Sequence, residues 1–451
     1  MKSVLLNKAT IVTSKKEAKG SIFVSGGKIT DIIYADSDDF EEILNEKISE
    51  AGEIEVIELE GKYIMAGGID GHVHFREPGL THKADISTES KAAVAGGVTT
   101  VIDMPNTSPA TVSVETFMEK MELAKGRSAA NISFHIGATN NNVNEIIDML
   151  EGCTDIDPKD IGGVKVFMGS STGNMLVDES ATLDRLFSIS SKPVLVHCED
   201  EATIRENLNA AIEKYGEDIP FSEHEHIRSR KACIKSSIKA LEKAMKYNTK
   251  LVLCHISTKE EIEMVRAAKA INPEIKAETS CNYLWFTNEG YDTMGSRLKC
   301  NPAVKTEMDR KVLREALSNG AIDMIGSDHA PHLLTEKEGP YTKVPSGLPS
   351  IQQTLPVLLT IAAEEEIPLT RIAAVFSENA ADVYGLKRGK IKRNYAADLV
   401  IFDKDKEITV KGEDQFSKCG WTPYEGTVLK GCIESVMVNG EIIYDGNKFT
   451  N

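Results

Sequence analysis

Two histidines and an arginine alternate along one short segment, from Asp70 to Gly79, whose sequence is DGHVHFREPG. If this segment is extended, the alternation of side chains places His72 and His74 on the same face, as two ligands of one metal ion require. Four further residues of similar chemistry stand inside or directly after apolar runs: Lys165, His197, His255 and Asp328. Imidazole and carboxylate groups suit zinc, and suit cobalt, manganese or iron less well. Together these residues predict a metal site.

Lys165 stands inside the apolar run 163–168, where an unpaired ammonium group would be costly. In one interpretation it forms a buried salt bridge, with Asp328 or Glu278 as its partner. In the other, CO₂ carboxylates the amine, and the product is an anionic bridge between two metal ions. The residues alone leave both interpretations open.

The other histidines divide by their surroundings. His82, His224 and His226 lie in polar segments, and we predict that they are solvated. His135 stands in an apolar run at 132–138, where it either supports a ligand or has a structural role. A single histidine at the end of a strand is more often a hydrogen-bonding partner than a ligand, so the metal prediction depends on convergence.

Eight apolar runs alternate with helix-like segments in the middle of the chain, at 63–69, 98–104, 132–138, 163–168, 193–196, 251–254, 275–279 and 321–325. One helix is predicted over 257–270, with Ser257 and Glu260 at the spacing of a capping box. The pattern predicts an α/β fold, either a (β/α)₈ barrel or a doubly wound open sheet. Active sites of such barrels lie at the carboxyl ends of the strands, where the candidate ligands would meet, so we favour the barrel.

The two ends of the chain differ from the middle. Alternating apolar runs flank the turn at 26–28, and a second hairpin is predicted around Asn439 and Gly440. We therefore predict a small β-sandwich domain formed by residues 1–60 and 389–451, and a catalytic barrel over residues 61–388.

Composition restricts the classes of partner. The 451-residue chain has a net charge of −17, which disfavours nucleic acid and anionic membranes as general partners. No apolar run approaches the length of a membrane helix, and the start does not resemble a signal peptide. The eight cysteines are isolated from one another, so we expect reduced, mostly buried thiols in a cytoplasmic protein and no zinc–thiolate site.

Two metal ions sharing one hydroxide would provide a nucleophile at neutral pH. The reaction class predicted from the residues is therefore metal-assisted hydrolysis, with an amide-like bond as the target. The residues do not name the substrate.

Several segments resemble the dihydroorotase family, a cyclic-amide branch of the amidohydrolases. The resemblance rests on DGHVHFREPG at 70–79, MPNT at 104–107, SDHAPH at 327–332, AADLV at 396–400 and WTPYEG at 421–426. These motifs keep their order over nearly the whole chain.

The resemblance implies a binuclear zinc site in a (β/α)₈ barrel. His72 and His74 would bind one metal ion, His197 and His255 the other, and carboxylated Lys165 with a hydroxide would bridge them. Asp328 would bind metal and carry a proton. The substrate-binding residues would be Arg76, Asn106, His332 and Asn301.

The implied reaction is the reversible closure of N-carbamoyl-L-aspartate to (S)-dihydroorotate in de novo pyrimidine synthesis. We expect a homodimer, and an association with aspartate carbamoyltransferase is a further expectation. Lys165 resembles the hydantoinase and allantoinase pattern equally well, so allantoinase, dihydropyrimidinase and hydantoinase are alternatives. A metal-free scaffold homologue is a more distant one, because none of the six ligand positions has lost its residue.

Overall fold

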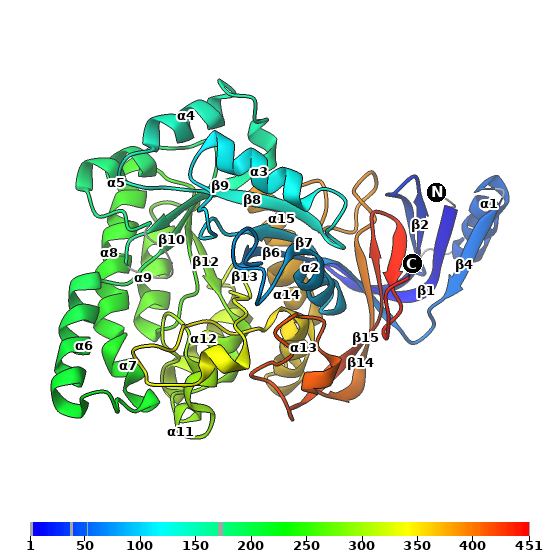
Figure 1. The fold of residues 1–451 in the computed structure, drawn as a ribbon. Helices are drawn as coiled ribbons and strands as arrows, with labels where there is room; N and C mark the ends of the chain where they lie inside the picture. Colours follow the sequence, from blue (N-terminus) through cyan, green and yellow to red (C-terminus); the bar gives the residue numbers. More distant parts are fainter. Residues whose placement is uncertain (1–2, 37–38, 52, 170–174, 451) are drawn as a thin grey trace.

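Two β-sheets of different kinds organise the protein, and most helices surround one of them (Figure 1). The computed structural model describes residues 3–36, 39–51, 53–169 and 175–450. The middle of the chain forms a parallel barrel, whereas both chain ends join in a separate sheet, and the two termini lie on that side of the molecule. The predicted combination of a (β/α)₈ barrel with a β unit built from both ends is confirmed.

The barrel consists of parallel strands in the order β13-β12-β11-β10-β9-β8-β7-β6. Their bounds are β6 Gly68–Val73, β7 Val98–Asp103, β8 Asn131–Gly137, β9 Ile161–Phe167, β10 Val194–His197, β11 Leu251–Leu253, β12 Lys276–Thr279 and β13 Met324–Ile325. Strands β6, β7, β9 and β10 are buried on both faces, which explains why they appear in the sequence as continuous apolar runs.

The first and last strands of the barrel meet without a regular ladder. A single bridge joins Val73 to His329, which follows β13, and the His74 amide donates to the His329 carbonyl at 2.8 Å. This bridge therefore closes the barrel next to the predicted metal ligands.

The first predicted barrel run, 63–69, is divided between the two sheets. Residues Tyr63–Ala66 form β5, which pairs with β14 and β1 in the sheet of the chain ends. The barrel strand β6 does not begin until Gly68. A continuous apolar run indicates burial and carries no information about a change of sheet, so the prediction of one strand was wrong here.

The sheet of the chain ends has the order β16-β15-β14-β5-β1-β2-β3, with β4 paired to β1. Its strands are β1 Ser3–Val12, β2 Glu17–Ser25, β3 Lys28–Tyr34, β4 Ile54–Glu58, β5 Tyr63–Ala66, β14 Leu399–Thr409, β15 Val428–Val438 and β16 Glu441–Tyr444. Both predicted hairpins are present, β2–β3 and β15–β16. Leu6, Ile22, Ile64 and Leu399 belong to one buried cluster that ties the two chain ends together.

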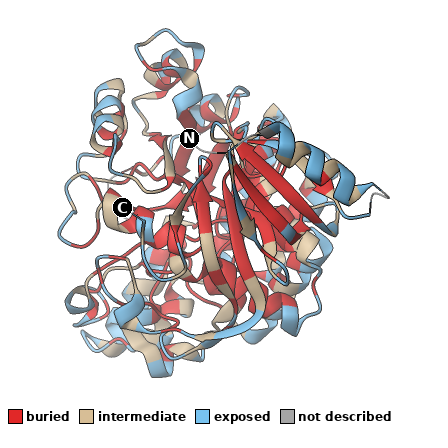
Figure 2. Ribbon diagram, turned by 90° about the vertical axis from the view of Figure 1, so that its right-hand side faces the viewer, coloured by how far each residue is buried: buried red, intermediate tan, exposed pale blue. Residues whose placement is uncertain are grey.

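The helices are α1 Phe40–Ala51, α2 Ile86–Ala95, α3 Val114–Ala124, α4 Val143–Glu151, α5 Ser180–Phe187, α6 Glu201–Tyr215, α7 His224–Ile227, α8 Arg230–Tyr247, α9 Lys259–Lys269, α10 Cys281–Trp285, α11 Gly290–Met294, α12 Glu307–Asn319, α13 Thr354–Glu364, α14 Leu369–Ala373 and α15 Asn379–Tyr384. In Figure 2 the strands at the centre are mostly buried, and exposed residues gather on the helices and loops around them. Among the described helices, none combines the length and apolar content that a membrane crossing requires.

Two details of the sequence prediction are tested by local geometry. The capping box of α9 uses Thr258 and Glu261, one residue later than predicted, because the Thr258 side chain accepts from the Glu261 amide.

The cysteines are all free thiols. Cys153 is exposed, Cys432 is half-buried and the other six are buried, as the expectation of mostly buried thiols required.

Candidate metal centre

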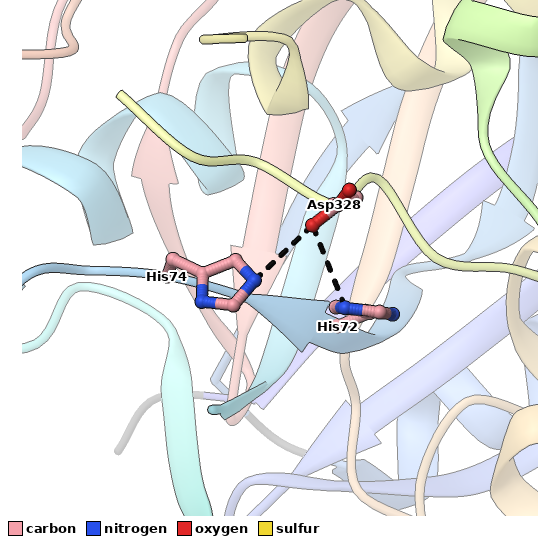
Figure 3. A group of neighbouring side chains, drawn as sticks. All are labelled: His72, His74 and Asp328. Carbon is pink, nitrogen blue, oxygen red and sulfur yellow. Dashed lines mark hydrogen bonds and ion pairs between the residues drawn. The ribbon is translucent and has the colours of Figure 1, made fainter. Parts of the chain in front are cut away.

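Three of the predicted ligands meet where β6 ends and the segment after β13 begins. Figure 3 shows His72, His74 and Asp328 pointing toward one another. Asp328 Oδ1 lies 3.1 Å from His74 Nε2 and 3.5 Å from His72 Nε2. One carboxylate oxygen and two imidazole nitrogens therefore face one point, which is the donor arrangement of a metal site.

His197 and His255 form a second group. His197 is the last residue of β10, His255 follows β11, and His197 Nδ1 lies 2.8 Å from His255 Nε2. The rings of His72 and His255 have centroids 5.3 Å apart, so the two groups are neighbours.

Lys165 projects from β9 and is fully buried. The positive charge of its ammonium group helps to lower the pKa of His72 and Asp328 in the first group and of His197 and His255 in the second. Its hydrogen-bond partner is Cys254 Sγ at 3.4 Å, and in the described part of the chain no carboxylate lies within ion-pair distance of its Nζ. The predicted salt bridge with Asp328 or Glu278 is therefore absent there.

One small cavity, of about 30 Å³, brings the predicted residues together. The described residues that line it are His72, His74, Arg76, Lys165, Phe167, His197, His255, Asn301, Asp328, Ala330, Ser346 and Gly347. All six predicted ligands and two of the four predicted substrate-binding residues are in this set.

Three histidines of the cavity have the protonation state that ligands need. Burial lowers the pKa of His72, His197 and His255, so their imidazoles are neutral and retain a lone pair for a metal ion. The Nδ1 atom of His255 has no hydrogen-bond partner among the described residues. Neutral imidazoles and a carboxylate around a polar cavity fit a metal site.

Arg76 lines the same cavity and is buried. Its Nε donates to the Pro331 carbonyl at 3.1 Å, and its NH2 lies 3.0 Å from His332 Nε2. Within the described residues no carboxylate pairs with its guanidinium, since Glu77 binds Arg127 and Asp85 binds Lys418. Burial lowers the pKa of Arg76 to about 10, so it remains a cation at neutral pH.

Comparison with known proteins identifies the family that this site belongs to. Residues 63–443 match the model of the family described as Amidohydrolase family. The chain belongs to the amidohydrolase family.

Its curated amidohydrolase relatives include proteins named dihydroorotase. The one from Methanosarcina mazei is 33% identical over 401 residues, covering 86% of this chain and 85% of the relative. The one from Pyrococcus abyssi is 32% identical over 429 residues, covering 95% and 92%. The resemblance found in the sequence is thus confirmed at the level of the family.

Solved structures of hydantoinases have the same fold. The L-hydantoinase (dihydropyrimidinase) from Arthrobacter aurescens has a TM-score of 0.91 at 25% identity, covering 100% of this chain and 98% of the other. The dihydropyrimidinase from Brevibacillus agri NCHU1002 has a TM-score of 0.87 at 24% identity, covering 99% and 96%.

Three of the predicted ligand histidines of this amidohydrolase also contact polar side chains that do not line the cavity. Glu278 Oε1 lies 2.7 Å from His72 Nδ1, and Asn106 Oδ1 lies 2.7 Å from His74 Nδ1. Glu199 Oε2 lies 3.1 Å from His197 Nε2 and also pairs with Arg228. Such partners orient a ligand ring and determine which nitrogen carries the proton.

Three residues of the centre have a backbone conformation that side chains usually avoid. Arg76, His255 and Asp328 have φ values of 66°, 38° and 51°. Each such residue costs about 1–3 kcal/mol and persists only where its surroundings enforce it.

Only two of the four predicted substrate-binding residues line the cavity. Arg76 and Asn301 line the cavity, and Asn301 Oδ1 is buried without a hydrogen-bond partner in the described structure. Asn106 stands behind His74, and His332 stands behind Arg76, where its Nδ1 meets Lys83 at 3.1 Å.

The structure shows how far each of the other histidines is buried. His224, predicted to be solvated, is buried, and its nitrogens lie 2.7 Å from Tyr341 Oη and from the Cys300 carbonyl. The prediction for His224 was wrong because it relied on the polar residues next to it in the sequence. The side chains of His82 and His226 are exposed, as predicted. His135 is buried with its Nε2 2.9 Å from the Gly71 carbonyl, behind the segment that carries the first ligands.

Sequence reasoning missed the supporting role of Glu199, Arg228 and Glu278. Glu199 stands two residues after a predicted ligand, which was a usable signal. Glu278 was considered only as a partner of Lys165, and its contact with His72 depends on the closure of the barrel.

Proposed function

We propose that this amidohydrolase is a dihydroorotase, which interconverts N-carbamoyl-L-aspartate and (S)-dihydroorotate in de novo pyrimidine synthesis. The observation that carries the proposal is Arg76, a buried guanidinium that lines the cavity without a carboxylate partner among the described residues. Buried charges are normally paired, so a cavity with an unpaired cation in its wall fits an anionic ligand. Dihydroorotate carries a ring carboxylate, whereas dihydrouracil and allantoin do not.

We propose that His72, His74, His197, His255, Asp328 and a carboxylated Lys165 would hold two zinc ions. Two features support carboxylation of Lys165: its burial, and the absence of a carboxylate partner in the described part of the chain. The chemistry that such a pair supplies when bound is polarisation of the scissile carbonyl and a hydroxide nucleophile at neutral pH.

Asp328 is the residue of this chain that moves the proton. In the hydrolytic direction its carboxylate accepts a proton from the attacking water and delivers it to the ring nitrogen as the C–N bond breaks. In the biosynthetic direction Asp328 takes the proton from the carbamoyl nitrogen and returns it to the departing water. Its Oδ1 faces His72 and His74, which places the carboxylate at the cavity.

Arg76 positions the substrate in this scheme. Its planar guanidinium offers two parallel N–H groups to a carboxylate, which fixes the orientation of the ring as well as its charge. Asn301, whose Oδ1 has no partner in the described structure, offers a hydrogen-bond acceptor in the same cavity.

A turnover assay with zinc-loaded enzyme tests the proposal. Dihydroorotate, dihydrouracil and allantoin are compared at equal concentrations, and dihydroorotate is expected to have the highest kcat/KM. A preference for dihydrouracil or allantoin would contradict the proposal and assign the protein to the hydantoinase group, which has the same fold.

The other expectations remain predictions. We propose a homodimer, an association with aspartate carbamoyltransferase and a cytoplasmic location. Light scattering of the purified protein, alone and mixed with aspartate carbamoyltransferase, measures the first two directly.

A further inference from the structure

A buried carboxylate–imidazole pair lies directly behind Asp328. Glu89 of α2 is fully buried, and its Oε2 lies 2.7 Å from Nε2 of His329, the residue that follows Asp328. Neither side chain is among the described residues that line the cavity. Any effect of this pair on turnover must therefore pass through a neighbour.

The protonation of His329 follows from its contacts. Its Nδ1 faces the backbone N–H groups of Ser350 at 3.0 Å and Ile351 at 3.3 Å. Because both groups are donors, Nδ1 must be the accepting nitrogen, so Nε2 carries the proton and donates it to Glu89. The ring is thus held on both sides in one orientation.

Glu89 has further donors that hold its carboxylate in place. Oε2 also accepts from Ser417 Oγ at 2.6 Å, and Oε1 accepts from Thr88 Oγ1 at 2.7 Å and from the Lys418 amide at 3.0 Å. Ser417 and Lys418 belong to the C-terminal part of the chain. Glu89 therefore links α2 and the C-terminal segment to the residue next to Asp328.

Asp328 needs such support because its φ of 51° is unfavourable for a residue with a side chain. On its N-terminal side, the Ser327 amide donates to the Asp70 carboxylate at 3.1 and 3.2 Å. On its C-terminal side, the His329 amide donates to Ser327 Oγ at 3.1 Å, and the His329 carbonyl accepts from the His74 amide at 2.8 Å. The side chain of His329 is the additional anchor on that side.

We propose that Glu89 and His329 are positioning residues that hold Asp328 in the left-handed conformation in which its carboxylate faces His72 and His74. The inference rests on the proposed role of Asp328 in proton transfer. Loss of the anchor lets the backbone relax and moves the carboxylate away from the reacting atoms. A displacement of about 1 Å at a reacting group is enough to lower turnover by about a hundredfold.

Three variants of the metal-loaded full chain separate positioning from simple packing. His329→Asn keeps an acceptor for the Ser350 amide and removes the donor to Glu89. His329→Gln restores a donor that reaches Glu89. Ser417→Ala is the matched control, because it removes another hydrogen bond to the same oxygen of Glu89 and leaves His329 untouched.

We expect His329→Asn to lower kcat by about tenfold to a hundredfold with KM within about twofold of the wild type. His329→Gln should recover most of the lost kcat, and Ser417→Ala should lower Tm similarly to His329→Asn but change kcat less than about twofold. Metal content is measured for each variant so that kcat refers to fully loaded protein. An unchanged kcat in His329→Asn, or an equal loss in Ser417→Ala, would overturn the inference.

A structural readout keeps this inference separate from the choice of substrate. Crystal structures of the wild type and His329→Asn report the φ of Asp328 directly, and we expect it to leave the positive region in the variant. A positive φ retained in the variant would overturn the inference. If the wild type hydrolyses dihydrouracil or allantoin instead of dihydroorotate, only the proposed substrate is wrong, and kcat is measured on the substrate that it hydrolyses.

Discussion

Nε2 of His74 and Oδ1 of Asp328 lie 3.1 Å apart, although 254 positions separate the two residues in the chain. The contact exists because the first and last strands of the barrel are neighbours, so a residue after β13 meets residues at the end of β6. The contact joins His74, a proposed metal ligand, to Asp328, the proposed proton carrier. Replacing one of these residues should therefore affect a different property of the protein from replacing the other.

Asp328→Asn should separate proton transfer from metal binding. The amide keeps the shape and one acceptor oxygen of the carboxylate, so much of the metal should remain bound. It cannot accept a proton, so kcat should fall by about 10²–10⁴-fold. The pH–rate profile for hydrolysis should also lose its acidic limb. A variant that remains active with an unchanged acidic limb would assign proton transfer to another residue.

Lys165→Ala should lose both metal and activity, because it removes the proposed shared ligand and leaves a gap in the wall of the cavity. Acetate or propionate added to the variant should restore part of the metal content and part of the turnover by occupying that gap. Metal analysis and a turnover assay measure the two effects independently. Normal metal content and turnover in the variant would rule out the carboxylated lysine.

Arg76→Met should impair dihydroorotate selectively. A hydrogen-bonded charged pair contributes about 1.5–3 kcal/mol, so its loss should lower kcat/KM for dihydroorotate at least about tenfold. Neutral cyclic amides should be affected much less, and the metal content should be unchanged. Arg127→Met is a matched control, because that guanidinium pairs with Glu77 and does not line the cavity. Equal slowing of all substrates by Arg76→Met would contradict a role in carboxylate selection.

Lys120→Met should destabilise the fold. The Lys120 Nζ lies 2.7 Å from Asp103 Oδ2, and both side chains are fully buried behind the cavity segment. Removing the ammonium leaves a buried carboxylate unpaired, which should lower the free energy of unfolding by about 3–5 kcal/mol. Urea denaturation measures the change.

A second variant checks the cause of that loss. Asp103→Asn combined with Lys120→Met removes both charges, while the amide oxygen can still accept from the Phe75 amide, as Asp103 Oδ1 does at 2.8 Å. The double variant should be more stable than Lys120→Met alone. If it is less stable, the unpaired charge is not the source of the loss.

The sequence predicted the barrel because buried parallel strands appear as separate apolar runs, and it predicted the ligands because they follow those runs. It could not show that Tyr63 and Gly68 belong to different sheets, since both segments are buried and apolar. Nor could it choose Thr258 over Ser257 as the start of α9, because both residue types cap helices well and only the backbone geometry decides.

The supporting residues were harder to predict for a different reason. Glu89 and His329 are separated by 240 positions, and each is ordinary in its own segment. Their pairing depends on how α2 packs against the segment after β13, which no local pattern encodes. His224 shows the opposite case, a polar segment whose histidine is buried by the contacts it makes with Tyr341 and Cys300.

The first and last barrel strands, β6 and β13, meet without a regular ladder and are joined at the bridge between Val73 and His329. His72 and His74 stand on one side of this bridge, and Asp328 stands on the other. An ion coordinated by all three residues would therefore link the two edges of the sheet. In this protein, a bound ion would add to the bridge that already closes the barrel, and loss of the ion would weaken the cylinder at the place of the proposed chemistry.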